Sequence, residues 1–298
     1  DGYLDIYVSN DFWERDYLYI NQKDGTFKEE LTDRFGYISA NSMGADIADI
    51  NNDGFLDIFS TDMLPASNKR LKSAINLEEY FLEDMKMKST YFFQFVQNGL
   101  QLNNGDGTFK EIARYAGVDA TDWSWGSLIA DFNNDGNKDI FVSNGIYHDI
   151  TDLDFIDFLA DESFVKNVVK ESGKTDFTPF AEKLPLNKQV NYLFINDGNL
   201  KFKNKAVEMG IKTPSFSNGS AYGDLDNDGD LDLVVNNVNS EAMIYENNTK
   251  SNYLKIKLKG QGNNTGAIGT RLQLYTSKGI QILEQLPSEV FNPHVVMI

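Results

Sequence analysis

The sequence has no cysteine, and only 2 histidines and 6 prolines in 298 residues. Without cysteine there are no disulfide bonds, zinc–thiolate sites or thiol nucleophiles. The thrombospondin type of calcium repeat, which needs cystines, is excluded as well. Only His148 and His294 could serve as imidazole bases, and no G-x-S-x-G motif is present. No apolar run approaches the roughly 18 residues of a membrane helix, so we expect no membrane span.

Positive charge is also scarce. The chain has 27 Lys and Arg against 45 Asp and Glu, which gives a formal net charge of −18. Phosphate backbones are bound by clustered Lys and Arg, so the composition argues against a nucleic-acid partner. The hydrophobic fraction of 41% and the aromatic fraction of 13% are typical of a globular protein with a sizeable core.

Much of the acidic charge lies in a recurring nine-residue motif, D-x-[DN]-x-D-G-x-x-D. Complete copies occupy residues 49–57, 131–139 and 224–232, and Asp1 to Asp5 fit the last five positions of a fourth. A helical EF-hand needs Glu at position 12, where these copies have Ser60, Val142 and Val235. The β-branched and aromatic runs after each copy predict strands instead. Each loop therefore joins two strands.

The spacing of the motif suits calcium, which takes six to eight oxygen ligands. Side chains at positions 1, 3, 5 and 9 and the carbonyl at position 7 can surround one ion, and Gly at position 6 permits the sharp turn. We expect three complete Ca²⁺ sites and a truncated fourth. The alternative is a set of Asx-rich turns without metal. The predicted ligands are Asp49, Asn51, Asp53, Phe55, Asp57, Asp131, Asn133, Asp135, Asn137, Asp139, Asp224, Asp226, Asp228, Asp230, Asp232, Asp1 and Asp5.

A second repeated unit follows the partial copy at residues 1–5 and the complete copies at 49–57 and 131–139. Alternating strands bracket an Asp-Gly turn within residues 17–27, 99–109 and 192–202, which is a strong hairpin signal. Each repeat thus has four antiparallel strands, the blade of a β-propeller. The predicted fold class is all-β, with about four blades in residues 1–248 as part of a larger ring. Because the chain begins within a motif, we expect a piece of a longer protein.

Two insertions fall at equivalent places, between the second and third strands of a repeat, at about residues 63–90 and 145–189. Both have helical patterns. The first has an apolar face of Leu71, Ile75, Leu82 and Met85, and the second has a capping pair, Thr151 with Asp154. Equivalent insertions emerge on one face of a propeller, where binding loops are common.

Trp13, Trp123 and Trp125 could stack on sugars, but packing among the strands is the more ordinary role.

The composition changes after about residue 249, where the acidic loops stop. Strands are predicted at 253–258, 270–275 and 280–286, and we assign 249–298 to a small, partial β-domain. The repeats resemble the FG-GAP or VCBS repeats of the integrin-α-type propeller. The stretch from Gly266 to Leu274 resembles the start of an ASPIC/UnbV domain. Together they are similar to the cartilage-acidic-protein-like family and its bacterial relatives, although residues 292–296 depart from that family's His-Phe-Gly-Leu-Gly ending.

This resemblance implies a secreted or cell-surface protein, outer-membrane-associated if bacterial, with calcium in its propeller loops and commonly seven blades. Oxygen-only calcium sites also suit compartments with millimolar calcium. We expect a non-enzymatic module that binds a protein or glycan through the insertions. One alternative is a carbohydrate-active enzyme that uses carboxylates in residues 147–154, a stretch that equally suits a helix N-terminus. Another is an accessory subunit of an outer-surface uptake complex.

Overall fold

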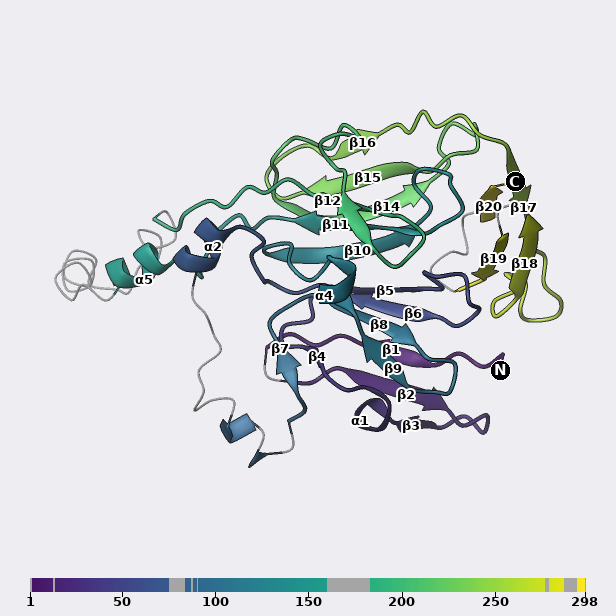
Figure 1. Cartoon of the computed structure of the whole chain (residues 1–298), viewed down its shortest axis with the longest axis horizontal. Coiled ribbons are helices and arrows are strands. Elements are labelled where there is room, and N and C mark those ends of the chain that lie inside the picture. The colour runs from purple at the N-terminus through teal and green to yellow at the C-terminus, as the bar shows by residue number, and fades with distance from the viewer. Residues whose placement is uncertain are drawn as a thin grey trace.

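The structure, a computed structural model, describes residues 2–12, 14–74, 84–86, 88–89, 91–159, 183–276, 279–286 and 294–297. Most of its regular structure is β, in small sheets that follow one another along the molecule (Figure 1). The prediction of an all-β, propeller-like fold is confirmed. Trp13, residues 75–83 of the first insertion and residues 160–182 of the second lie outside the described residues.

Four antiparallel sheets form the blades. Blade 1 consists of β1 (Ile6–Val8), β2 (Tyr17–Asn21) and β3 (Phe27–Glu29). Blade 2 consists of β5 (Ala45–Ala48), β6 (Asp57–Ser60), β8 (Gly99–Asn103) and β9 (Phe109–Glu111). Blade 3 consists of β10 (Ser124–Ala130), β11 (Asp139–Asn144), β12 (Tyr192–Asn196) and β13 (Phe202–Asn204). Blade 4 consists of β14 (Ser217–Gly223), β15 (Asp232–Asn237) and β16 (Met243–Tyr245).

The hydrophobic core is divided among the interfaces between blades. Along β11, Ile140 and Val142 face a cluster shared with blade 2, whereas Phe141 faces a cluster shared with blade 4. This alternation follows from the period of two in a strand, which sends successive side chains to opposite faces of the sheet. All three side chains are fully buried. A third cluster, which includes Leu18 and Ile58, joins blades 1 and 2. Each blade is therefore stabilised by its neighbours.

The antiparallel order places the connections at two opposite ends of the blades. The acidic loops and the Asp-Gly turns lie at one end, and the connections that carry the insertions leave from the other (Figure 1). The insertions contain α2 (Asn68–Ser73) and α5 (Leu153–Leu159). Short helices α1 (Leu31–Arg34) and α4 (Ala113–Ala116) follow β3 and β9, the last strands of blades 1 and 2.

The C-terminal segment lies at the acidic-loop end (Figure 1). Its strands β17 (Tyr253–Ile256), β18 (Arg271–Thr276) and β19 (Gly279–Glu284) agree with those predicted from the sequence. In addition, β20 (His294–Met297) pairs antiparallel with β17, and β18 pairs antiparallel with β19. Within the part of the chain that the structure describes, no helix is both long and apolar enough to cross a membrane.

Three local expectations need correction. First, a short parallel pair, β4 (Ile38–Ser39) with β7 (Gln94–Phe95), joins two connections outside the antiparallel blades. Second, Asp152 accepts a hydrogen bond from Phe155 N at 3.0 Å at the start of α5, in place of the expected Thr151.

Third, the expected apolar face of the first insertion is not buried where it is described. Leu71 and Met85 are 52% and 41% exposed, and Ile75 and Leu82 lie outside the described residues. Sequence periodicity shows which side chains share a helix face, but the packing of that face depends on the neighbouring elements.

Candidate metal centres

The three complete acidic loops share one backbone path. We name them loop A (residues 49–57), loop B (131–139) and loop C (224–232). Gly at position 6 has a φ of 97°, 97° and 100° in loops A, B and C, a conformation that residues with a Cβ rarely adopt. The residue at position 4 is Asn in every loop, and it too has a positive φ, of 58°, 58° and 66°. Asn is enriched in that region, so the Asn repeated at position 4 is a sequence signal for this turn.

Side-chain oxygens in loop B turn inward onto the loop's own amides. Asp131 accepts from Asp135 N at 3.0 Å through Oδ1 and from Gly136 N at 2.8 Å through Oδ2. Asn133 Oδ1 also accepts from Asp135 N, at 3.1 Å. Loop A repeats these contacts, with Asp49 accepting from Asp53 N and Gly54 N. The side chains of positions 1 and 3 therefore converge on the backbone amide of position 5, an arrangement shared by an Asx-rich turn and by an oxygen-ligated cation site.

The aspartate at position 9 has a structural role in addition to the ligand role predicted for it. In loop B, Asp139 accepts from Phe132 N at 3.1 Å through Oδ2 and from Asn196 N at 2.9 Å through Oδ1. Equivalent pairs of contacts hold Asp57 in loop A and Asp232 in loop C. All three residues are at most 2% exposed. Position 9 closes its loop and fastens it to the third strand, whether or not an oxygen lone pair also reaches a metal.

An asparagine at the end of β2, β8 and β12, and just after β16, completes this contact. Besides donating its backbone N–H to position 9, it donates Nδ2 to the carbonyl of position 8, at 3.1 Å in loop A and 3.0 Å in loop B. The sequence repeats this residue visibly, but its role emerges only when the third strand is paired with the second. The four equivalent residues are Asn21, Asn103, Asn196 and Asn247.

Loop C is the most open to a metal ion. Ligand oxygens of Asp224, Asp226 and Asp228 all lie within 4.8 Å of one another. Both carboxylate oxygens of Asp230 are buried without a hydrogen-bond partner in the described structure. The same holds for Asp224, although Lys255 Nζ lies 2.6 Å from its Oδ2 as an ion pair. Buried carboxylates without donors are costly, so this donor set fits a divalent cation.

The remaining predicted ligands are less informative. Asp1 lies outside the described residues, and Asp5 Oδ1 accepts from Asn21 N at 2.8 Å, as position 9 should. At position 7, Phe55 N and Asn137 N donate to the position 5 carboxylates Asp53 and Asp135, at 2.8 Å in each case. A contribution of the position 7 carbonyls to a metal stays a prediction.

Burial makes the loop carboxylates hard to ionise. It raises the pKa of Asp131 to about 6, that of Asp57 to about 7 and that of Asp139 to about 8. Backbone N–H donors oppose this effect, while neighbouring loop carboxylates add to it for all three aspartates. A bound divalent cation would favour the charged forms of the same groups.

These loops lie within repeats that match a known family. The model of the FG-GAP-like repeat matches residues 1–60, 93–142 and 181–235, together more than half of the chain. The chain belongs to the FG-GAP-like repeat family. The matched regions of this FG-GAP protein contain all three complete loops, and they omit most of both insertions and the C-terminal segment. No curated protein matches the chain.

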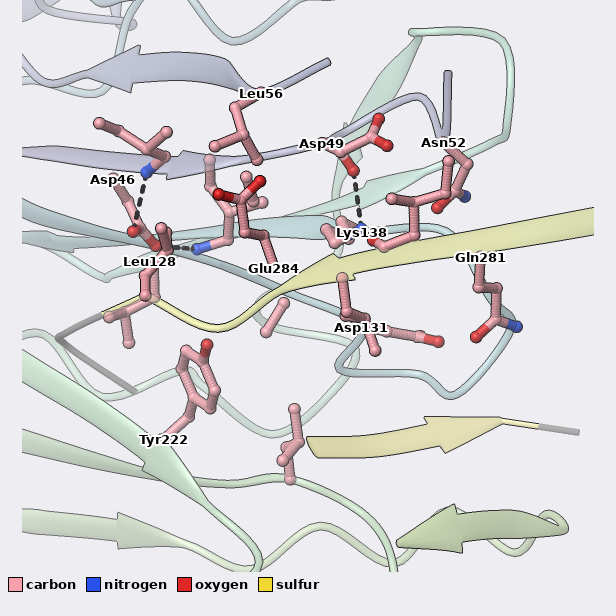
Figure 2. Close-up of a pocket in the computed structure, with 18 of the residues that line it drawn as sticks. Asp46, Asp49, Asn52, Leu56, Leu128, Asp131, Lys138, Tyr222, Gln281 and Glu284 are labelled. Atoms are coloured by element: carbon pink, nitrogen blue, oxygen red, sulfur yellow. Dashed lines mark hydrogen bonds between the residues drawn. The ribbon is translucent and has the colours of Figure 1, made fainter. Parts of the chain in front are cut away.

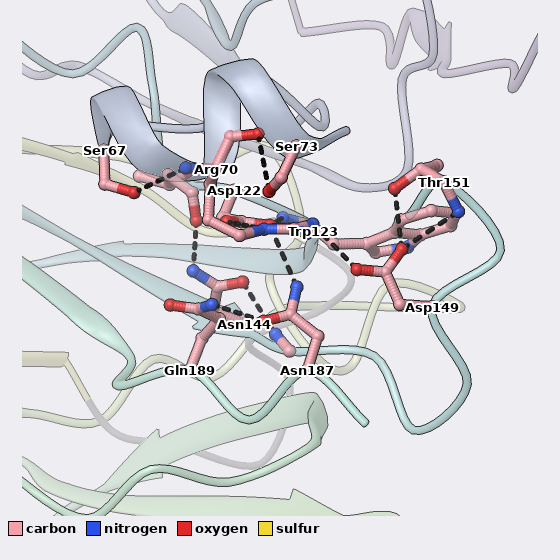
Figure 3. Close-up of polar contacts among 12 residues, drawn as sticks. Ser67, Arg70, Ser73, Asp122, Trp123, Asn144, Asp149, Thr151, Asn187 and Gln189 are labelled. Atoms are coloured by element: carbon pink, nitrogen blue, oxygen red, sulfur yellow. Dashed lines mark hydrogen bonds and ion pairs between the residues drawn. The ribbon is translucent and has the colours of Figure 1, made fainter. Parts of the chain in front are cut away.

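At the other end of the FG-GAP blades, Arg70 joins the two insertions. Its Nε lies 3.0 Å from Asp122 Oδ2, and its Nη2 lies 2.9 Å from Asp149 Oδ2 (Figure 3). Asp149 also accepts from Thr151 N and Oγ1. A backbone bridge pairs Ala74 with residue 152. The carboxylates that were candidates for catalysis in residues 147–154 thus include one in an ion pair and one, Asp152, that caps α5.

The tryptophans near this cluster are packed. Trp123 is only 7% exposed, and Trp125 donates Nε1 to Gly145 O at 2.8 Å. Their ring centroids lie 6.2 Å apart. These contacts favour packing over sugar stacking for both residues.

The C-terminal segment rests directly on the glycines at position 6. A Cβ on Gly54 would lie 2.0 Å from Arg271 Nη2, one on Gly136 would lie 2.9 Å from Gln281 Nε2, and one on Gly229 would lie 2.0 Å from the Tyr253 ring. In each loop, therefore, the missing side chain allows a residue of the C-terminal segment to approach the turn. The acidic loops and the C-terminal segment therefore pack against each other directly.

Proposed function

We propose that this FG-GAP protein is a calcium-binding, non-enzymatic module, located outside the cell or at its surface, which binds a protein or glycan partner through its insertions. The observation that carries the calcium assignment is loop C, where the carboxylates of Asp224, Asp226 and Asp228 converge and the buried Asp230 oxygens lie in the same loop without a hydrogen-bond donor. The inward-turned oxygens of loops A and B support the same chemistry at two further sites. FG-GAP repeats are in general adhesion or binding modules.

The C-terminal segment supports a finer assignment. The support for it is the resemblance of residues 266–274 to the start of an ASPIC/UnbV domain, in a stretch that leads into strand β18. We therefore propose a relationship to the cartilage-acidic-protein-like family. On this basis the boundary near residue 249 separates a propeller from a smaller β-domain.

The insertions are the proposed recognition surface because they leave the blades together, opposite the metal loops (Figure 1). Arg70 holds parts of both insertions against blade 3. A binding role is better supported than glycan cleavage, because Asp149 and Asp152 are already used for an ion pair and a helix cap. An Asp152→Ala variant should lose some stability, and no glycan-cleaving activity should depend on it.

Calcium binding is tested by metal analysis and thermal unfolding of the whole chain. We expect equilibrium dialysis against millimolar calcium to show calcium bound to the chain, and the melting temperature to fall when a chelator is added, since the ion binds only the folded loops. Asp228→Asn should reduce the calcium content by one site. A melting temperature that is indifferent to both calcium and chelator would remove the basis of the proposal.

A further inference from the structure

A cavity lies between the propeller and the C-terminal segment. Its walls are the first strands of blades 2, 3 and 4, namely β5, β10 and β14, and β19 covers it (Figure 2). Its volume is about 330 Å³, which is within the range of small-molecule sites, and such sites favour interfaces between domains. The first strands of propeller blades surround the central axis, so this cavity is distinct from the insertions on the opposite end of the blades.

The walls combine apolar surface with an excess of acid. Leu56, Leu128 and the ring of Tyr222 line the cavity, as do the carboxylates of Asp46 and Glu284. Figure 2 shows the Glu284 carboxylate directed away from β19, towards the side of the cavity that carries Asp46 and Leu56. Asp46 accepts from Ile47 N at 2.9 Å and from Ile129 N at 2.6 Å.

Glu284 has no comparable partner. Across the described ranges it forms neither a hydrogen bond nor an ion pair. The cations in the wall are directed elsewhere. Lys138 donates to the carbonyls of Asp49 and Ile282, at 2.7 and 3.1 Å. Arg271 is opposite Glu284 in the β18–β19 register, but its guanidinium lies over Gly54 of loop A and forms no ion pair with Glu284.

We propose that this cavity binds an organic ammonium ion with an apolar body. The ammonium would be held by Glu284 with Asp46 beside it, and the apolar body would lie against Leu56, Leu128 and Tyr222. A charged donor would satisfy the unpartnered carboxylate, and charge-assisted hydrogen bonds of this kind are about twice as strong as neutral ones. The site is independent of the recognition role proposed for the insertions.

The test uses three probes of matched shape on the calcium-loaded chain: phenethylamine, neutral 2-phenylethanol and the anion 3-phenylpropionate. Isothermal titration should show phenethylamine binding at least about tenfold more tightly than 2-phenylethanol, with no measurable binding of the anion. Glu284→Gln should weaken the amine about tenfold and leave 2-phenylethanol unchanged. Glu241→Gln, on an exposed residue, is the control of equal charge change and should bind the amine as the parent does.

A second variant tests the location without changing charge. Ala221 lines the cavity and is exposed, so Ala221→Phe should fill part of the space without disrupting the core, and it should abolish binding of the amine. Equal affinity for the amine and the alcohol, or amine binding that survives both Glu284→Gln and Ala221→Phe, would overturn the proposal. Absence of amine binding in the folded parent would overturn it as well, and would indicate that Glu284 turns to Arg271 in solution.

Discussion

Loops A and B differ from loop C in what neutralises the aspartate at position 1. Asp49 and Asp131 each accept two backbone N–H groups from their own loops. Asp224 has no such donors, and the ammonium of Lys255, from β17 of the C-terminal segment, lies 2.6 Å from it. Loop C also has carboxylates at positions 3 and 7, where loops A and B have none. The same motif therefore produces one backbone path, but the position 1 aspartate is stabilised by backbone N–H groups in loops A and B and by a lysine in loop C.

The largest effect should come from the part that all loops share. Asp139→Ala would leave the buried amides of Phe132 and Asn196 without acceptors, and we expect it to lower the free energy of unfolding by about 3 kcal/mol. Asp135→Ala should cost less in chelator and lose mainly the stabilisation that calcium adds. Urea unfolding of both variants, with calcium and with chelator, measures the difference. Equal losses in chelator would mean that position 9 has no separate structural role.

The pH dependence of stability should distinguish metal-free from calcium-bound loops. Burial raises the pKa of Asp57 to about 7 and that of Asp139 to about 8, against about 3.9 in an unfolded chain. The folded state therefore holds protons that the unfolded state has released, and their contribution is complete below about pH 4 and lost as the pH rises to about 8.

The melting temperature of metal-stripped protein should accordingly fall between pH 5 and pH 8. Saturating calcium should flatten this dependence, because the ion stabilises the ionised carboxylates. Thermal unfolding at several pH values, with and without calcium, makes the measurement. A metal-free melting temperature that rises over this range would contradict the burial of these groups.

Lys255 offers a direct test of the difference between the loops. A positive charge beside Asp224 opposes a divalent ion in loop C, so Lys255→Met should raise the calcium affinity of that loop about tenfold. Terbium luminescence can report on loop C, because the Tyr253 ring lies against Gly229. Lys257→Met, at an exposed position on the same segment, is the control for net charge. Equal affinities of the two variants would show that Lys255 does not compete with the metal.

The smallest effect should come from the asparagine at position 4. Asn134→Ala would place a residue with a Cβ at a φ of 58°, at a cost of about 1 kcal/mol, while Asn134→Gly should be nearly neutral. In loop C, Asn227 also accepts from Lys255 Nζ at 3.3 Å. Asn227→Ala should therefore cost slightly more than Asn134→Ala in urea unfolding, and a smaller cost would argue that the Lys255 contact contributes nothing.

Features that depend on a few consecutive residues were predictable. The acidic loops, the Asp-Gly hairpins and the strands at 253–258 and 270–275 follow from turn chemistry and period-two alternation, and the structure has strands in these places. The positions of the insertions could also be predicted from the sequence, since a blade repeat has a nearly constant length. Helix caps were less accurate, because Thr151 and Asp152 are both suitable capping residues and only the local backbone selects Asp152.

The sequence by itself determined the repeat, the antiparallel blades and the residues that crowd oxygen atoms into each loop, because all of these arise from local spacing. Only the tertiary structure decided that position 9 fastens its loop to the third strand, that Arg70 joins the insertions, and that Lys255 and Glu284 face loop C and the cavity. These contacts join residues 15 to 79 positions apart, or a strand to a surface built from three blades. The order of residues along the chain does not specify which distant groups will meet.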